Sequence, residues 1–230
     1  MRSIGIVPAR AGSKRVPGKN LRRLGGKALV AHAIEQAVAA GALSRVVVSS
    51  DDLGVLKLAE GYDGVVVLER PEELATDTAP AIGYVQHVLA HFERMGERFD
   101  AVAILQPTSP LRLAIDIDAC VTHLDASGAD TCVTVAEVEH AAHPLKLKRM
   151  VGDRLVPLLE EERGRMMAHE LPPVFVRNCA VYASRVAVIA SGEVIGADCR
   201  GVVMPRERSV DVNDELDLAF AEFLWARREC

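Results

Sequence analysis

Short apolar runs rich in β-branched residues alternate along this chain with longer segments whose apolar residues repeat at the helical period. Such alternation is typical of βαβ units, in which helices pack on a mainly parallel sheet. The short runs predict strands over residues 3–7, 45–49, 64–68, 100–105, 130–135 and 180–182. The longer segments predict helices over residues 28–40, 53–60, 80–94, 114–127 and 214–228. The expected fold class is therefore α/β.

Residues with short polar side chains precede two of these helices at positions that suit an N-terminal cap. Thr78 precedes the third helix, and Asn213 and Asp214 precede the last one. The last helix ends with Arg227 and Arg228, and cations are favourable at a helix C-terminus. We expect Thr78 to cap the third helix and either Asn213 or Asp214 to cap the last.

The length of 230 residues suits one large α/β domain, so we expect residues 1–230 to form a single domain. The alternation weakens between Glu137 and Val176, where clustered charge and two consecutive prolines occur. This stretch predicts an insertion into the sheet. A lid, an arm and a dimer contact all remain open for residues 137–176.

The charge balance and the hydropathy pattern exclude two classes of partner. The chain has 27 basic and 32 acidic residues and a formal net charge of −5, whereas nucleic-acid binders usually carry a net basic field. Charged residues make up 26% of the chain, and no apolar run approaches the roughly 20 residues of a membrane span. We expect neither a nucleic-acid partner nor a membrane.

The five cysteines are scattered and show no C-x-x-C spacing, so zinc binding and a dithiol redox pair are not indicated. They are typical of ordinary reduced thiols. The first residues are too few and too polar for the apolar core of a signal peptide. We expect a cytoplasmic protein.

A basic loop, residues 8–20, directly follows the first predicted strand and carries four cations within ten residues. Ligands bind at the carboxyl ends of strands in open α/β sheets, and such a loop can turn N–H groups and cations toward phosphates. Five residues separate Gly12 from Gly18 and Asn20 follows Lys19, so the loop is not a P-loop, and the G-x-G-x-x-G pattern is absent. The alternative is a solvated basic turn.

Three segments, residues 8–20, 105–112 and 209–217, resemble the hallmark segments of the acylneuraminate cytidylyltransferases, the CMP-sialic acid synthetases. Residues 70–71, 74–79, 143–146 and 175–182 extend the resemblance over nearly the whole chain. Several motifs in the same order are far more specific than any one of them. The resemblance implies a Rossmann-like sheet of the nucleotide-diphospho-sugar transferase type, with helices on both faces and a small inserted dimerisation segment.

The resemblance implies the reaction of this family, in which CTP and a nine-carbon 2-keto sugar acid give a CMP-sugar and pyrophosphate. The anomeric hydroxyl of the sugar attacks the α-phosphorus, with Mg²⁺ as cofactor and a homodimer as the working form. One alternative is a cytidylyltransferase for another keto-sugar acid, such as the 3-deoxy-octulosonic type. Another is a nucleotide-binding module without turnover, and a P-loop kinase is disfavoured by the loop spacing.

By this resemblance, a set of residues in the basic loop and after the third strand would bind the nucleotide. These are Ala9, Arg10, Ser13, Lys14, Lys19, Asn20, Arg70, Thr78 and Ala79. Arg10 and Lys19 would also act in catalysis by stabilising charge on the α-phosphate and the leaving group. For Arg70 the alternative is a surface ion pair with Glu72 or Glu73.

The resemblance places a second set of residues beside the sugar acid. These are Gln106, Thr108, Ser109, Arg112, Lys146, Arg177 and Asn178. The alternative for the 106–112 segment is a rigid turn between two prolines, with Thr108 or Ser109 capping the next helix. Lys146 lies in the inserted region, where a surface position or a contact with a neighbouring subunit is the alternative.

Asp211 and Asn213 are the expected metal ligands, and Asp211 is the third catalytic candidate. Oxygen ligands of this kind suit Mg²⁺, which takes one or two carboxylates together with substrate phosphates. The chain departs from the family pattern at Asn213, where some relatives have a second Asp. It departs again at Cys179, where relatives usually have Gly, a residue that allows a positive φ. The alternative for Asn213 is a helix cap.

Overall fold

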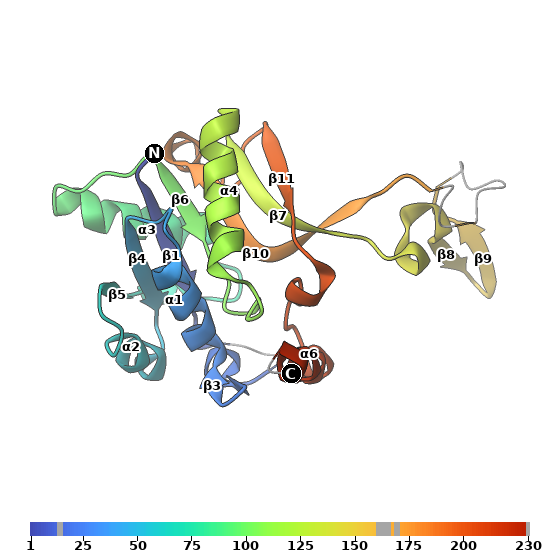
Figure 1. The fold of residues 1–230 in the computed structure, drawn as a ribbon, viewed down its shortest axis with the longest axis horizontal. Helices are drawn as coiled ribbons and strands as arrows, with labels where there is room; N and C mark the ends of the chain where they lie inside the picture. The colour runs from blue at the N-terminus through green and yellow to red at the C-terminus, as the bar shows by residue number, and fades with distance from the viewer. Residues whose placement is uncertain (13–15, 160–166, 168–170, 229–230) are drawn as a thin grey trace.

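A sheet that has seven strands within the described residues forms the centre of the protein (Figure 1). The computed structural model describes residues 1–12, 16–159, 167 and 171–228. The strand order is β11 (Cys199–Val203), β7 (Thr131–Glu137), β10 (Phe175–Arg185), β6 (Ala101–Ile104), β1 (Ser3–Pro8), β4 (Arg45–Ser50) and β5 (Val65–Glu69). β10 runs antiparallel to both neighbours, and every other pair in this sheet is parallel. The predicted mainly parallel α/β sheet is confirmed.

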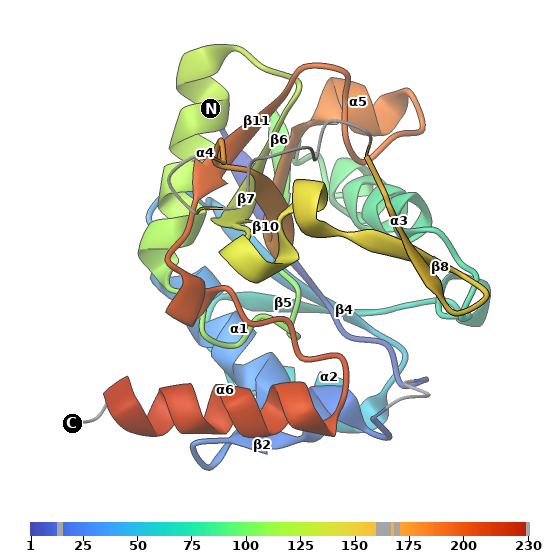
Figure 2. The same ribbon diagram turned by 90° about the vertical axis from the view of Figure 1, so that its right-hand side faces the viewer.

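Helices cover both faces of the sheet, as Figure 2 shows. The helices α1 (Leu29–Ala39), α2 (Leu53–Ala59) and α4 (Ala114–Ser127) pack on one face, and α3 (Ala81–Arg94) and α5 (Val186–Ala190) pack on the other. Alternate strand residues supply the two cores: Val7 faces α1, whereas Ile4 and Ile6 face α3. The five predicted helices are all present, and α5 and β11 were missed.

The last helix, α6 (Glu215–Arg228), lies across one end of the molecule against a small hairpin, β2 (Arg23–Leu24) and β3 (Lys27–Ala28) (Figure 2). Asp214 caps α6, because its carboxylate accepts the Asp217 N–H at 3.0 Å. The cap expected from Thr78 is wrong: Pro80 stands at the N-cap of α3 and forms no side-chain cap bond. Thr78 is exposed in the preceding turn.

An arm leaves the sheet between β7 and β10 and projects well beyond it (Figure 1). Its base is the continuation of the two strands, where Phe175 pairs with Glu137. Its outer part carries the hairpin of β8 (Lys148–Val151) and β9 (Arg154–Pro157), with short 3-10 helices η3 (His140–Ala142) and η4 (Pro144–Lys146). The segment expected as an insertion is this arm. The remaining 3-10 helices are η1 (Lys19–Leu21), η2 (Glu72–Leu74) and η7 (Arg206–Arg208).

The helices are short, and none in the described ranges combines the length and the apolar character needed to cross a bilayer. α3, α4 and α6 each have 14 residues, fewer than the roughly 20 that a span requires. Each also carries charged or polar residues on its outward side.

Candidate active site

A cavity of about 140 Å³ opens where β1 and β6 end side by side. Parallel strands end at the same edge of the sheet, which is where ligands bind in open α/β folds. The lining comes from the loops after β1 and β6: Pro8, Arg10, Gly12, Lys19, Asn20, Gln106, Pro107 and Thr108. The fold thus brings the basic loop and the polar loop, residues 105–112, together, although about 90 residues separate them in sequence.

The path of the basic loop is set by hydrogen bonds to the end of β4. The Ala9 N–H donates to the Ser49 carbonyl at 3.0 Å, and the Ser50 hydroxyl donates to the Ala9 carbonyl. The Ala11 N–H donates to the Asp51 carboxylate at 2.9 Å. Asp51 was missed by the sequence analysis, although its position two residues after a predicted strand was a usable signal. The backbone polar groups of Ala9 are therefore used within the protein.

Asn20 supports the same loop from inside, because its side-chain amide donates to the Arg10 carbonyl at 2.9 Å. The Arg10 guanidinium itself pairs with the Asp77 carboxylate at 2.5 Å, and both side chains are about one-third exposed. This contact joins the basic loop to the turn that holds Thr78 and Ala79. Ser13 and Lys14, the other cationic and hydroxyl candidates of the loop, lie outside the described residues.

Arg70 is buried, so the alternative of a surface ion pair with a neighbouring glutamate is wrong. Its Nε donates to the Ser49 hydroxyl at 3.1 Å and its Nη2 donates to the Ser49 carbonyl at 2.8 Å. The guanidinium also lies 4.4 Å from the centre of the Tyr84 ring. Burial lowers the pKa of Arg70, and burial raises the pKa of Tyr84 to about 12. Arg70 is thereby held rigidly at the end of β4.

The segment that follows η7 lies against both loops of the cavity. The Lys19 ammonium donates to the Val212 carbonyl at 3.1 Å. The Val212 N–H donates to the Thr108 carbonyl at 2.7 Å. Val212, which lies between Asp211 and Asn213, is therefore bonded to the basic loop through its carbonyl and to the polar loop through its N–H.

Asp211 and Asn213 contact each other, and Asn213 does not cap α6. The Asn213 amide donates to the Asp211 carboxylate at 2.9 Å and to the Asp211 carbonyl at 3.2 Å. Of the two cap residues expected, Asp214 is confirmed and the alternative of an Asn213 cap is wrong. Among the described residues no group of three or more His, Cys, Asp and Glu side chains could hold a metal ion. One carboxylate with an adjacent amide fits Mg²⁺ when substrate phosphates and waters supply the other ligands.

Arg112 and Ser109 lie beneath the polar loop. Arg112 is 1% exposed, and its Nη1 donates to the carbonyls of Gln106 at 3.1 Å and Ala180 at 2.7 Å. Burial lowers its pKa to about 10. The Ser109 hydroxyl is fully buried and donates to the Asn178 carbonyl at 3.4 Å. Both residues shape the loop from below and present Gln106 and Thr108 to the cavity.

The helix cap expected from Thr108 or Ser109 is wrong. The N-cap of α4 is Leu113, whose N–H donates to the Asp116 carboxylate at 2.9 Å. Of the rigid-turn alternative for residues 106–112, the part that predicted a helix cap is therefore excluded.

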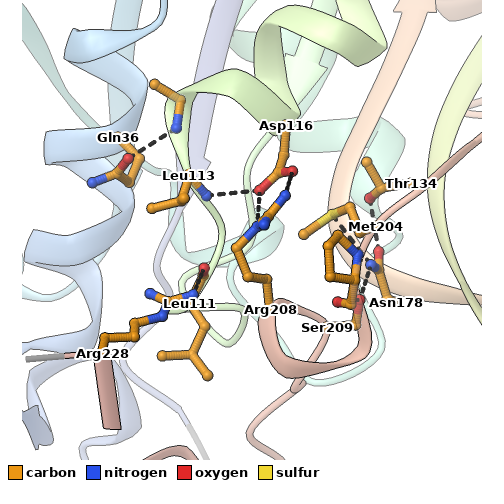
Figure 3. A network of polar contacts seen from close by, with 12 residues as sticks. Gln36, Leu111, Leu113, Asp116, Thr134, Asn178, Met204, Arg208, Ser209 and Arg228 are labelled. Carbon is orange, nitrogen blue, oxygen red and sulfur yellow. Dashed lines mark hydrogen bonds and ion pairs between the residues drawn. The ribbon is translucent and has the colours of Figure 1, made fainter. Parts of the chain in front are cut away.

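Asn178 is buried and ties three segments together (Figure 3). Its amide oxygen accepts from the Thr134 hydroxyl at 2.7 Å, and its amide nitrogen donates to the Ser209 hydroxyl at 2.9 Å. Arg177 beside it is exposed at the start of a register shift in β10.

Cys179 has a φ of 62°, the only positive φ outside glycine among the described residues. The left-handed conformation is the one for which the usual glycine is suited. The Tyr182 hydroxyl donates to its sulfur at 3.3 Å. Burial raises the pKa of the Cys179 thiol, and the nearby Asp211 carboxylate raises it further. This thiol is therefore held in its neutral, weakly nucleophilic form.

Lys146 is not brought to the cavity. It lies in η4 on the arm, where its ammonium contacts both ring nitrogens of His140, at 3.1 and 2.7 Å. The arm projects well beyond the sheet (Figure 1), and Lys146 is not among the residues that line the cavity.

The fold and the cavity define a class of protein: an α/β protein with a candidate ligand site at the carboxyl edge of a mainly parallel sheet, lined by basic and polar residues. The cytidylyltransferase family model matches residues 4–190, and the chain belongs to this family. Membership in a cytidylyltransferase family was expected from the ordered motifs, and this expectation is confirmed.

Curated relatives carry the names of CMP-sugar-acid-forming enzymes. The chain is 46% identical over 112 residues to CMP-N,N'-diacetyllegionaminic acid synthase of Legionella pneumophila, which covers 49% of the chain and 48% of the relative. It is 28% identical to N-acylneuraminate cytidylyltransferase of Escherichia coli over 95% of the chain and 51% of the relative. It is 25% identical to pseudaminic acid cytidylyltransferase of Campylobacter jejuni over 98% of the chain and 97% of the relative. The chain thus spans about half the length of the first two.

Solved structures with the same fold include two synthases. One is a CMP:2-keto-3-deoxy-manno-octonic acid synthetase complexed with CTP, with a TM-score of 0.71 and 18% identity over 99% of this chain and 100% of that chain. The other is a 4-diphosphocytidyl-2C-methyl-D-erythritol synthase, with a TM-score of 0.68 and 12% identity over 97% and 99% of the two chains. At these identities the likeness shows the fold alone.

Proposed function

We propose that this protein joins CTP to a nonulosonic acid, a nine-carbon 2-keto sugar acid, to give a CMP-sugar and pyrophosphate. The observation that carries the proposal is the cavity that Arg10 and Lys19 line together with Gln106 and Thr108, with the Asp211 segment bonded to both loops. Cations on one wall suit phosphates, and an amide and a hydroxyl on the other suit a sugar acid.

The nucleotide would lie over the basic loop. Arg10 and Lys19 contact the triphosphate, and the phosphate replaces Asp77 as the partner of Arg10, because a triphosphate carries more charge than one carboxylate. Asn20, and by the family resemblance Ser13 and Lys14 of the same loop, would contribute to nucleotide binding. Arg70 and the Thr78–Ala79 turn lie on the β4 side of the loop, where the cytidine fits.

The sugar acid would lie against Gln106 and Thr108. Ser109, Arg112 and Asn178 would act indirectly, because all three are buried and the Ser109 hydroxyl, the Arg112 Nη1 and the Asn178 amide are bonded to other groups beneath the loop. Arg177, which is exposed beside Asn178, would be the cation that binds the carboxylate of the sugar.

The reaction needs positioning and charge stabilisation, and no covalent intermediate. The anomeric hydroxyl forms a bond to the α-phosphorus, the bond from that phosphorus to the bridging oxygen breaks, and pyrophosphate leaves with the electron pair while the hydroxyl proton is released. Asp211 would hold Mg²⁺ with Asn213 beside it, and the ion supplies positive charge to the phosphate oxygens. Lys19 and Arg10 supply the remaining positive charge. Cys179 has no nucleophilic role in this scheme.

The arm would pair two copies of the chain. The exposed apolar side chains of the β8–β9 hairpin, Met150, Val151 and Leu155, would be covered in such a homodimer. Lys146 would then lie near the second copy, which accounts for its distance from the cavity of its own chain. The cytoplasmic location stays a prediction, and it agrees with the four described cysteines, all of which are free thiols.

The test is pyrophosphate release from CTP and Mg²⁺ with legionaminic, pseudaminic, sialic and 3-deoxy-octulosonic acids, with ATP, GTP and UTP as nucleotide controls. We expect release with CTP and a nine-carbon acid only. Release with the octulosonic acid alone would show instead a cytidylyltransferase for an eight-carbon keto-sugar acid. A rise in melting temperature with CTP and no release with any acid would leave a nucleotide-binding module and contradict the proposal.

A further inference from the structure

A mostly buried ion pair joins the first turn of α4 to η7 (Figure 3). Arg208 donates to both carboxylate oxygens of Asp116, from Nη2 at 2.6 Å and from Nε at 3.1 Å. The Asp116 side chain is 6% exposed and the Arg208 side chain 22%. A two-bond contact of this kind fixes orientation as well as distance, since the guanidinium and the carboxylate are both planar.

Asp116 lies in the first turn of α4 and is bonded to the end of the polar loop. Its carboxylate also accepts the N–H of Leu113, the residue at which the 105–113 loop ends and α4 begins. The loop is bonded further at its base by Arg228, which donates to the Leu111 carbonyl at 2.6 Å. Any shift of Asp116 would therefore be transmitted to the loop that carries Gln106 and Thr108.

Arg208 belongs to the segment that carries Asp211, three residues further along the chain. Ser209 accepts from the Asn178 amide at 2.9 Å, and the Val212 N–H reaches Thr108 at 2.7 Å. Asp211 lies between these two attachments, and the Asn213 amide donates to its carbonyl and to its carboxylate, so its position depends on the residues on each side.

Three arginines, Arg112, Arg208 and Arg228, lie near the single carboxylate of Asp116. Arg112 and Arg228 donate to backbone carbonyls, and of the three only Arg208 bonds this carboxylate in the described structure. The hydrogen bond to Asp116 raises the pKa of Arg208, which keeps the pair charged. Loss of Asp116 would leave like charges facing one another, which favours separation of the two segments.

We propose that Asp116 and Arg208 are positioning residues that set the placement of Asp211 relative to the Gln106–Thr108 loop. The inference rests on the proposed function, in which Asp211 and that loop act on the two substrates of one reaction. The pair touches neither substrate, and it acts through the segment and the loop that it joins.

The experiment compares Arg208→Met, Arg208→Lys and Asp116→Asn with the wild type. Asp116→Asn keeps an oxygen that can accept the Leu113 N–H, so α4 keeps its start while the charge is lost. Arg200→Met is the matched control, because Arg200 forms an exposed pair with Asp198 away from the cavity. The readouts are kcat, KM for CTP, and hydrogen exchange of the Val212 amide measured without substrates.

In Arg208→Met and Asp116→Asn we expect kcat to fall about 10- to 100-fold with KM for CTP within about threefold, since displacement of a reacting group by an ångström costs rate of this order. The Val212 amide should exchange at least about tenfold faster, because a looser segment opens its bond to Thr108 more often. Arg208→Lys should recover part of both losses, and Arg200→Met should change neither.

Unchanged kcat with faster exchange, or lower kcat with an unchanged Val212 amide, would each overturn the proposal. The exchange measurement separates this inference from the proposed function. If the wild type turned over no sugar acid, the proposed function would fail, and an unprotected Val212 amide in Arg208→Met would still establish that the pair places the segment. If the Val212 amide stayed protected in Arg208→Met, the positioning role of Asp116 and Arg208 would be overturned.

Discussion

The side-chain amide of Asn213 donates to the carboxylate of Asp211 at 2.9 Å, so the residue that replaces a second aspartate in this chain holds the first one in place. A neutral donor at this distance stabilises the carboxylate without any metal. A second carboxylate would repel it in the absence of a cation and attract a cation more strongly.

Asn213→Asp should therefore lower the Mg²⁺ concentration needed for half-maximal turnover and lower stability without metal. We expect a loss of about 1 kcal/mol, or a fall in Tm of ~2–4 °C, from the like charges. Thermal unfolding with and without Mg²⁺ tests this directly. A Tm that drops equally in both conditions would show that the second carboxylate does not meet the metal. Asn213→Ser is the control for loss of the amide.

Cys179→Gly should stabilise the protein, because φ is 62° at this residue and a Cβ is disfavoured there. The gain is offset in part by the greater freedom of glycine in the unfolded chain. Cys179→Ala is the matched control, since it loses the sulfur contact with Tyr182 and keeps the Cβ. We expect Gly to exceed Ala by about 1 kcal/mol in urea unfolding, and equal stabilities would contradict backbone strain at this position.

Lys19→Ala should reduce kcat by about 10²- to 10³-fold and affect CTP binding much less, if the ammonium acts on charge that develops in the transition state. The measurement is kcat and KM for CTP, with Kd by calorimetry. Lys27→Ala removes a lysine that pairs with Glu35 away from the cavity and is the control. Equal losses in Kd and kcat would assign Lys19 to ground-state binding.

Stability should fall as the pH drops below 6.5, because burial lowers the pKa of His32. The unfolded chain then binds a proton that the folded chain resists, so unfolding is favoured between 6.5 and the lower folded value. His32 bonds the Leu24 carbonyl at 2.8 Å and packs on Trp225, whose fluorescence can follow unfolding.

His32→Gln should flatten the dependence of the unfolding free energy on pH in this range. His123→Gln, the same substitution at an exposed position, is the control. Burial also lowers the pKa of His87, so the difference between variant and wild type is the informative quantity. An unaltered slope in His32→Gln would assign the pH dependence to other groups.

Met150→Glu combined with Leu155→Glu should convert a dimer into monomers. These side chains face each other across the β8–β9 hairpin and are 72% and 67% exposed, so the fold of the single chain should not depend on them. Light scattering after size exclusion gives the mass. Leu53→Glu, at another highly exposed apolar site, is the control. A wild-type chain that is monomeric at micromolar concentration would contradict the arm as a dimer contact.

Local pattern was enough to predict the strands of the parallel core and the helices between them. Each of these elements has an apolar face whose period is visible within about ten residues. β11 and the arm hairpin were missed because their strands are short and carry charge or glycine, as in Cys199–Val203, and their pairing partners are distant in sequence. The basic loop and its place after the first strand were likewise readable from the residues.

The roles of the polar residues depended on the tertiary structure. Nothing in the sequence distinguishes Arg112, which is buried under a loop, from Arg10 at the cavity, because the same side chain can serve both positions. Likewise, Asn213 stands where a cap was expected and contacts Asp211 instead.

By itself the sequence determined the class of fold, the family motifs and the edge of the sheet at which the candidate site lies, because these follow from patterns within short windows. Only the tertiary structure decided which side chains reach the cavity and which ones hold it in place. Lys19 and Val212 meet over 193 residues, and Asp116 and Arg208 over 92. Contacts at such separations arise when the packed elements bring their ends together, and no local preference encodes them.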